Sequence, residues 1–166
     1  MVKWLDYFSG RQAPRLAAMD EPAARALPPL VLGLAADLVR SIDDGVRARG
    51  FDDLRPAHGF AFARLAPDGA TVGDLAEHLG VTKQAASQMV EELVRKGYVE
   101  RHPHPGDARA RLVVLTERGW ACTRAADEAA ADAVRPWQQT LGDQRLRQLA
   151  ADLAALAPSG RLRPAW

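Results

Sequence analysis

The side chains between residues 82 and 88 bring hydrogen-bonding and cationic groups together on one predicted helix. At helical spacing one face carries Lys83, Gln84, Ser87 and Gln88. The opposite face is apolar and carries Ala86, Met89, Val90 and Leu93. A glutamine amide bonds an adenine edge at two points, and a lysine reaches a phosphate or a guanine. Thr82 is placed to cap this helix while its first N–H groups face a phosphate. The pattern therefore indicates a face that contacts nucleic acid.

The alternative for this face is an ordinary solvated surface, which more often mixes glutamate with lysine. Here the acidic residues Glu91 and Glu92 begin only after two helical turns. We expect both to stand away from the DNA, so the base-facing interpretation is favoured.

A second group of charges lies between residues 101 and 111. Arg109 is the predicted minor-groove residue, because a narrow groove concentrates negative potential around a guanidinium. Asp107 can orient Arg109 through a charge-assisted hydrogen bond. Arg101 and Arg111 are expected to contact backbone phosphates. The alternative is a surface hairpin with an exposed ion pair of little energetic value.

Other reactive residue types give weaker signals. His102 and His104 lack the nearby cysteine or carboxylates that a metal site needs, so no metal is expected. Cys122 is the lone cysteine; a small core residue is favoured over a redox sensor, since it has no resolving partner. No catalytic motif occurs, and neither an enzymatic activity nor a cofactor is expected.

The elements that position these residues are mainly helical. The first 28 residues are interpreted as an extension with a short helical piece. A helix is predicted from Pro29 to Arg49, with Pro29 at its first position and Gly50 just beyond its end. Pro56 begins the next helix, which ends before the turn at 67–69.

Residues 72–91 have the layout of a helix-turn-helix. Thr71 and Asp74 form a predicted capping box, and that helix ends at Gly80. The second helix runs from Thr82 to Lys96. Two strands follow, at 98–101 and 111–115, joined by a turn at 103–107. A long helix should then begin at Thr116, kink or restart at Pro136, and be followed by a last helix from Asp143.

The segments V-T-K-Q-A-A-S-Q-M-V-E-E-L-V-R-K-G-Y-V-E-R and P-G-D-A-R-A-R-L-V-V-L-T-E-R-G resemble the MarR family of bacterial transcription regulators. The family's pattern is a recognition helix ending L-x-x-x-G-[LY]-V-x-R, a D-x-R wing and an L-T-x-x-G junction. The matching positions are Leu93, Gly97, Tyr98, Val99, Arg101, Asp107, Arg109, Leu115, Thr116 and Gly119. The clear match covers roughly residues 54 to 119, including Leu54-Arg-Pro-Ala-His58 at the opening of a helix.

The resemblance implies a mainly α fold with a small β-hairpin wing. One domain, residues 1–166, would comprise an N-terminal extension and dimerisation helix (1–50), a winged helix-turn-helix (51–119) and C-terminal dimerisation helices (120–166). It further implies a homodimer that binds a double-stranded DNA operator, most simply as a repressor, and possible binding of a small aromatic or anionic effector. No effector-binding residue is assigned.

The net charge of the chain does not indicate a nucleic-acid-binding protein. The 22 basic and 21 acidic residues leave a net charge of +1. Basic residues outnumber acidic ones in 81–118, by 7 to 5, whereas 51–80 has 2 basic and 5 acidic residues. DNA binding would therefore depend on a small local surface. The alternatives are a winged-helix module that binds another protein and a small-molecule carrier without a DNA role.

The tryptophans lie outside residues 51–116, at Trp4, Trp120, Trp137 and Trp166. They are interpreted as dimer-interface core, with the wall of a ligand cavity as the alternative. No apolar run is long enough to span a membrane and no signal-peptide core is apparent. A cytoplasmic protein is expected.

Overall fold

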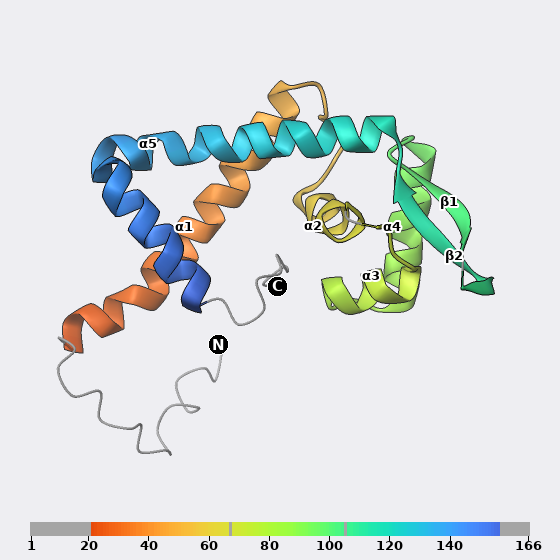
Figure 1. Cartoon of the computed structure of the whole chain (residues 1–166), viewed down its shortest axis with the longest axis horizontal. Helices are drawn as coiled ribbons and strands as arrows, with labels where there is room; N and C mark the ends of the chain where they lie inside the picture. Colours follow the sequence, from red (N-terminus) through yellow and green to blue (C-terminus); the bar gives the residue numbers. More distant parts are fainter. Residues whose placement is uncertain (1–20, 67, 105, 157–166) are drawn as a thin grey trace, which may run out of the picture. The chain divides into compact units, whose positions relative to one another are not determined.

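The computed structural model describes residues 21–66, 68–104 and 106–156, with side chains except at Glu21, Ala23, Asp107, Ala108 and Arg109. The chain divides into two compact units, residues 1–37 and residues 38–166. Its elements (Figure 1) are α1 (Glu21–Ala48), α2 (Pro56–Leu65), α3 (Val72–Leu79), α4 (Lys83–Arg95), β1 (Val99–His104), β2 (Asp107–Leu115) and α5 (Glu117–Leu156). The predicted fold class, mainly α with a β-hairpin, is confirmed.

Helix α1 begins earlier than predicted. It starts at Glu21 and includes Pro28 and Pro29, so the expected start at Pro29 is wrong. Pro22 lies in its first turn, where backbone N–H groups have no partner within the helix, so the missing N–H of proline costs no hydrogen bond. Within the first unit, α1 exposes the large apolar side chains of Leu27, Leu30, Val31, Leu32 and Leu34.

Local capping signals define the short helices of the second unit. Pro56 is the first residue of α2, as predicted. The Thr71 hydroxyl accepts a hydrogen bond from the N–H of Asp74, whose carboxylate accepts one from the N–H of Thr71. Gly80 ends α3 in the left-handed conformation (φ 66°, ψ 31°). The Thr82 hydroxyl caps α4 by accepting from the N–H of Ala85 at 3.2 Å.

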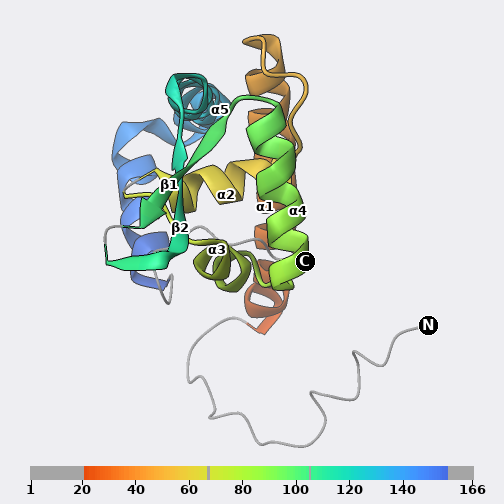
Figure 2. The ribbon, with the colours of Figure 1, turned by 90° about the vertical axis from the view of Figure 1, so that its right-hand side faces the viewer.

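The β-hairpin is longer than predicted and has a shorter turn. Its strands begin pairing at Val99 with Leu115 and continue to His104 with Asp107. Ala70 pairs with Val113 on the other side of β2, through hydrogen bonds of 3.0 and 2.8 Å. β1 is thus an edge strand, which tolerates Pro103 because an edge residue needs no second ladder bond. Figure 2 looks onto this hairpin and the neighbouring α4.

Helix α5 passes through Pro136 and is interrupted at Gly142. Its first turn is capped by the Thr116 hydroxyl, which accepts from the N–H of Gly119 at 3.2 Å. The expected kink or restart at Pro136 is wrong, because the non-helical backbone is at Gly142 (φ 73°, ψ 162°), a conformation that glycine alone adopts readily. Asp143 therefore opens the last helical segment, as predicted, and its carboxylate accepts from the amide of Gln138 at 2.7 Å.

The core of the second unit lies between α2, α3, α4, the hairpin and the start of α5. Its largest fully buried side chains are Tyr98, Leu65, Leu75, Leu79, Leu93, His58, Val90, Val99 and Val113. No helix in the described part of the chain combines the length and apolarity that crossing a membrane requires.

Candidate nucleic-acid interface

The turn between α3 and α4 holds the two helices of the predicted helix-turn-helix together. After the left-handed Gly80, the N–H of Val81 donates to the carbonyl of Ala76 at 3.0 Å. The contact surfaces of the two helices are buried and carry Leu75, Ala76, Leu79, Ala86, Val90 and Leu93. This apolar seam leaves the opposite side of α4 facing outward.

The outward side of α4 carries the residues that were predicted to contact DNA. Lys83, Gln84 and Gln88 are exposed, and Ser87 is half-buried. Thr82, also exposed, uses its hydroxyl as the helix cap. The other four lie in the first half of the helix, where amide and ammonium groups are available to a ligand at the surface.

The two acidic residues farther along α4 behave differently. Glu92 is half-buried and turned toward α2, where its carboxylate accepts hydrogen bonds from Arg55 and Lys96. Glu91 is exposed and, four residues after Ser87, continues the outward face. Glu92 is therefore turned away from this face whereas Glu91 remains on it, and the expectation that both stand away from the DNA stays a prediction.

The hairpin presents two of the predicted arginines. Arg101 and Arg111 are exposed. The register pairs Arg101 with Val113 and Pro103 with Arg111, so side-chain alternation places both arginines on the same face of the ribbon. The side chains of Asp107 and Arg109 lie outside the described residues, and their predicted pairing stays a prediction.

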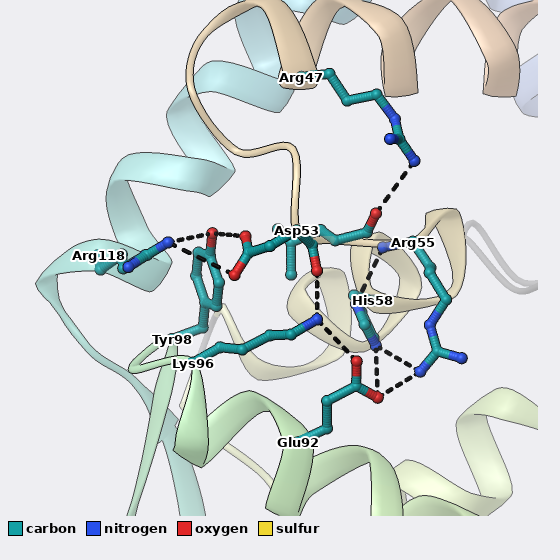
Figure 3. Close-up of polar contacts among 9 residues, drawn as sticks. Arg47, Asp53, Arg55, His58, Glu92, Lys96, Tyr98 and Arg118 are labelled. Atoms are coloured by element: carbon teal, nitrogen blue, oxygen red, sulfur yellow. Dashed lines mark hydrogen bonds and ion pairs between the residues drawn. The ribbon is translucent and has the colours of Figure 1, made fainter.

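The structure reveals a polar network behind α4 that the sequence did not indicate (Figure 3). The Tyr98 hydroxyl donates to Asp53 Oδ1 at 2.6 Å, and Arg118 Nη2 donates to the Tyr98 oxygen at 3.0 Å. Burial and the Asp53 carboxylate raise the pKa of Tyr98 to about 12, and the same hydrogen bond lowers the pKa of Asp53. The sequence marks Tyr98 only as a motif position, because no local pattern relates it to Asp53.

The network continues toward α2. Lys96 Nζ donates to the Asp53 carbonyl and to Glu92 Oε1, the latter at 2.8 Å. Glu92 Oε2 accepts from Arg55 and lies 3.8 Å from His58 Nε2. His58 is fully buried, and this burial lowers its pKa to about 4. Since His58 Nδ1 accepts from the N–H of Arg55 at 3.1 Å, the neutral ring carries its proton on Nε2, toward Glu92.

Cys122 is part of the core. It is buried, and this burial raises the pKa of its thiol to about 11, so the thiolate is scarce at neutral pH. The interpretation as a small core residue is supported. In the described ranges no group of three histidine, cysteine, aspartate or glutamate side chains is arranged to hold a metal ion. His102 instead pairs with Glu100 at 2.9 Å.

Comparison with known proteins gives a family match over the winged region. Residues 55–110 match the model of the MarR family. Comparison with curated protein sequences gives no significant match.

Solved structures share the fold over most of the chain. RV1404 from Mycobacterium tuberculosis is 24% identical, with 89% of this chain and 99% of that chain covered and a TM-score of 0.69. Wild-type MarR from E. coli in its apo form is 24% identical, with coverages of 78% and 95% and a TM-score of 0.65. A mutant MarR from E. coli complexed with operator DNA is 24% identical, with coverages of 83% and 95% and a TM-score of 0.62.

Proposed function

We propose that the protein is a transcriptional regulator that binds duplex operator DNA as a homodimer, because residues 55–110 match the model of the MarR family. The observation that carries the proposal is the exposed first half of α4, with Lys83, Gln84 and Gln88 directed away from the core. A structural relative, the mutant MarR from E. coli, is complexed with operator DNA. The family assignment also supports a protein without catalytic activity and an action on chromosomal DNA in the cytoplasm.

In this proposal the first half of α4 enters the major groove. Gln84 and Gln88 bond base edges, Ser87 contributes a hydroxyl, and Lys83 contacts a phosphate or a guanine. The N-terminus of α4 at Thr82 approaches a phosphate.

The hairpin contacts the flanking DNA. Arg101 and Arg111 bind backbone phosphates from the same face of the ribbon. Arg109 enters the minor groove and is oriented by Asp107. Phosphate contacts supply affinity that depends on salt, whereas base contacts supply sequence preference.

The exposed apolar residues of α1 support the homodimer. Leu34 is 46% exposed and Leu30 59% exposed, although both are large and apolar. A contiguous set of this kind marks an interaction surface. A second copy of the chain would cover this surface. The two recognition helices of the resulting dimer would lie about one turn of DNA apart and read a pseudo-palindromic operator. We further propose that the protein is a repressor released by a small aromatic or anionic effector.

The proposal is tested by selecting a duplex from a random-sequence library and measuring its affinity. Binding should weaken steeply between about 50 and 200 mM salt. Gln88→Ala should relax base preference, whereas Arg111→Ala should weaken all duplexes similarly and reduce the salt slope by about 1. Gln139→Ala, at an exposed glutamine of α5, is the matched control and should bind as wild type does.

A failure to enrich any duplex would contradict the proposed function. The same holds if affinity stays constant across this salt range, or if Gln88→Ala and Gln139→Ala behave alike.

A further inference from the structure

We propose that Asp53, Tyr98 and Arg118 form a polar clamp that fixes the position of α4 relative to α5, and that these three are positioning residues for DNA binding. The functional part of this inference rests on the proposed function, whereas the clamp itself concerns the free protein. None of the three lies on the outward face of α4.

The clamp joins three segments that are distant in the sequence. Asp53 belongs to the loop before α2, Tyr98 directly precedes β1, and Arg118 is in the first turn of α5. Arg118 Nη2 lies 3.0 Å from the Tyr98 oxygen and 3.7 Å from Asp53 Oδ2, and its guanidinium stacks 4.5 Å from the centre of the Tyr98 ring. Each member contacts the other two (Figure 3).

Backbone contacts connect the clamp to the end of α4. The N–H of Tyr98 donates to the carbonyl of Leu93, and the N–H of Thr116 donates to the carbonyl of Tyr98, both at 3.0 Å. The Thr116 hydroxyl donates to the carbonyl of Gly97 at 2.7 Å. Lys96, the last residue before Gly97, donates to the Asp53 carbonyl. The end of α4 and the start of α5 therefore meet at Tyr98.

The polar contacts of Tyr98 are directional, whereas the apolar packing around its ring is not. The Tyr98 ring is 0% exposed and packs against Phe51 and Phe62, with centroids 6.3 and 5.7 Å away. Apolar contacts of this kind tolerate sliding, whereas a buried hydroxyl must keep its partners. One placement of Tyr98 satisfies Asp53 and Arg118 together.

A small displacement at this end of α4 becomes a larger one at the reading end. The 13 residues of α4 extend over roughly 20 Å. A tilt of about 5° at Tyr98 would move Lys83 by roughly 1.7 Å, enough to break hydrogen bonds to base edges. If losing the clamp leaves a tenth of molecules in the competent placement, apparent affinity falls about tenfold.

The first test uses two adjacent aspartates whose substitution changes the charge equally. Asp53→Asn and Asp52→Asn each remove one negative charge, but Asp52 is exposed and outside the clamp. Electrostatics alone predicts that both bind DNA slightly more tightly. The clamp predicts that Asp53→Asn binds the selected duplex roughly tenfold more weakly, while an unrelated duplex of equal length is bound no less tightly than by wild type.

The second test uses one substitution that leaves the net charge unchanged and a pair of substitutions that each remove one positive charge. Tyr98→Phe removes only the hydroxyl and should weaken binding to the selected duplex roughly tenfold. Arg118→Gln should do the same, whereas Arg124→Gln, at an exposed arginine of the same helix, should show only the small loss expected for one charge. All variants are compared under conditions in which urea titration shows them to be folded. Should Asp53→Asn fail to fold, Tyr98→Phe carries the test.

Hydrogen–deuterium exchange of the free protein tests the clamp without DNA. Tyr98→Phe should accelerate exchange in residues 92–98 and leave α3 protected, whereas a general loss of stability would accelerate both. Unchanged exchange in residues 92–98, or unchanged preference for the selected duplex in Tyr98→Phe, would overturn the clamp. If wild type selects no duplex, the proposed function fails while this exchange experiment still decides the clamp.

Discussion

His58 is a histidine kept neutral by its surroundings. It lies in the first turn of α2, where its Nδ1 accepts the N–H of Arg55. Burial is the largest cause of the lowered pKa, and the positive charges of Arg55 and Lys96 act in the same direction. The carboxylates of Glu92 and Asp53 favour the charged ring but are outweighed. The result is a pKa of about 4 in the folded protein, against a usual value near 6.5.

This depressed pKa predicts a loss of stability on mild acidification. Between pH 6.5 and 4 the unfolded chain binds a proton at His58 that the folded chain does not. The free energy of unfolding should therefore fall as pH falls through this window, by on the order of 3 kcal/mol in total. The pKa of Glu92 is also lowered, but its carboxylate adds to the loss only below about pH 4.5.

Urea unfolding of wild type and His58→Asn at pH 6.5 and pH 5 checks this. Asparagine keeps a side-chain hydrogen-bond acceptor close to the position of the histidine Nδ1, and the substitution should flatten the pH dependence. Gln139→Asn, at an exposed residue that does not titrate, is the control and should leave the dependence as steep as in wild type. Equal slopes in wild type and His58→Asn would contradict the assignment.

At the scale of elements, Gly119 permits the close approach of α5 to the start of β1. A Cβ atom at this position would lie 2.3 Å from the Tyr98 carbonyl oxygen and 3.1 Å from Leu115 Cδ2. Backbone on one side and core on the other leave no room for a methyl group. The glycine of the L-T-x-x-G motif therefore has a steric cause.

Gly119→Ala should lower the free energy of unfolding by about 1–3 kcal/mol, because α5 must shift away from Tyr98. Gly59→Ala is the matched control: Gly59 is exposed in α2, and a methyl group there would contact nothing within 4 Å. It should stabilise the protein by up to about 1 kcal/mol. Urea denaturation measures both, and a Gly119→Ala protein as stable as Gly59→Ala would refute the steric explanation.

For the whole molecule, the proposed homodimer accounts for apolar surface that would otherwise face water. The exposed set on α1 includes Leu27, Val31 and Leu34, which recur at helical spacing. Trp120 of α5 is 41% exposed and Trp137 is half-buried, and the role of these tryptophans at an interface stays a prediction. Trp4 and Trp166 lie outside the described residues.

Leu34→Glu should convert the proposed dimer to a monomer at micromolar concentration, because it buries a charge in an apolar contact. Ala36→Glu adds the same charge about 200° farther round the helix and should leave the dimer intact. Sedimentation velocity distinguishes the two species. A monomeric wild-type protein, or dimers of equal stability in both variants, would exclude this face as the interface.

The sequence by itself determined the features that depend on short-range physics. Thr71 and Asp74 are three residues apart, so their capping box follows from helix geometry, and Gly80 supplies a backbone conformation that few other residues adopt. The outward face of α4 follows from helical spacing in the same way. These signals located the helix-turn-helix and the predicted DNA-binding residues on it.

Only the tertiary structure decided the features that depend on contacts between distant segments. The hairpin extends past Pro103 because β1 is an edge strand, whose other side pairs with no described strand, and α5 breaks at Gly142 rather than at Pro136. Asp53 meets Tyr98 across 45 residues. Such a pairing leaves no periodic or adjacent pattern, because the packing of α2, α4 and α5 brings the two groups together after the local elements have formed.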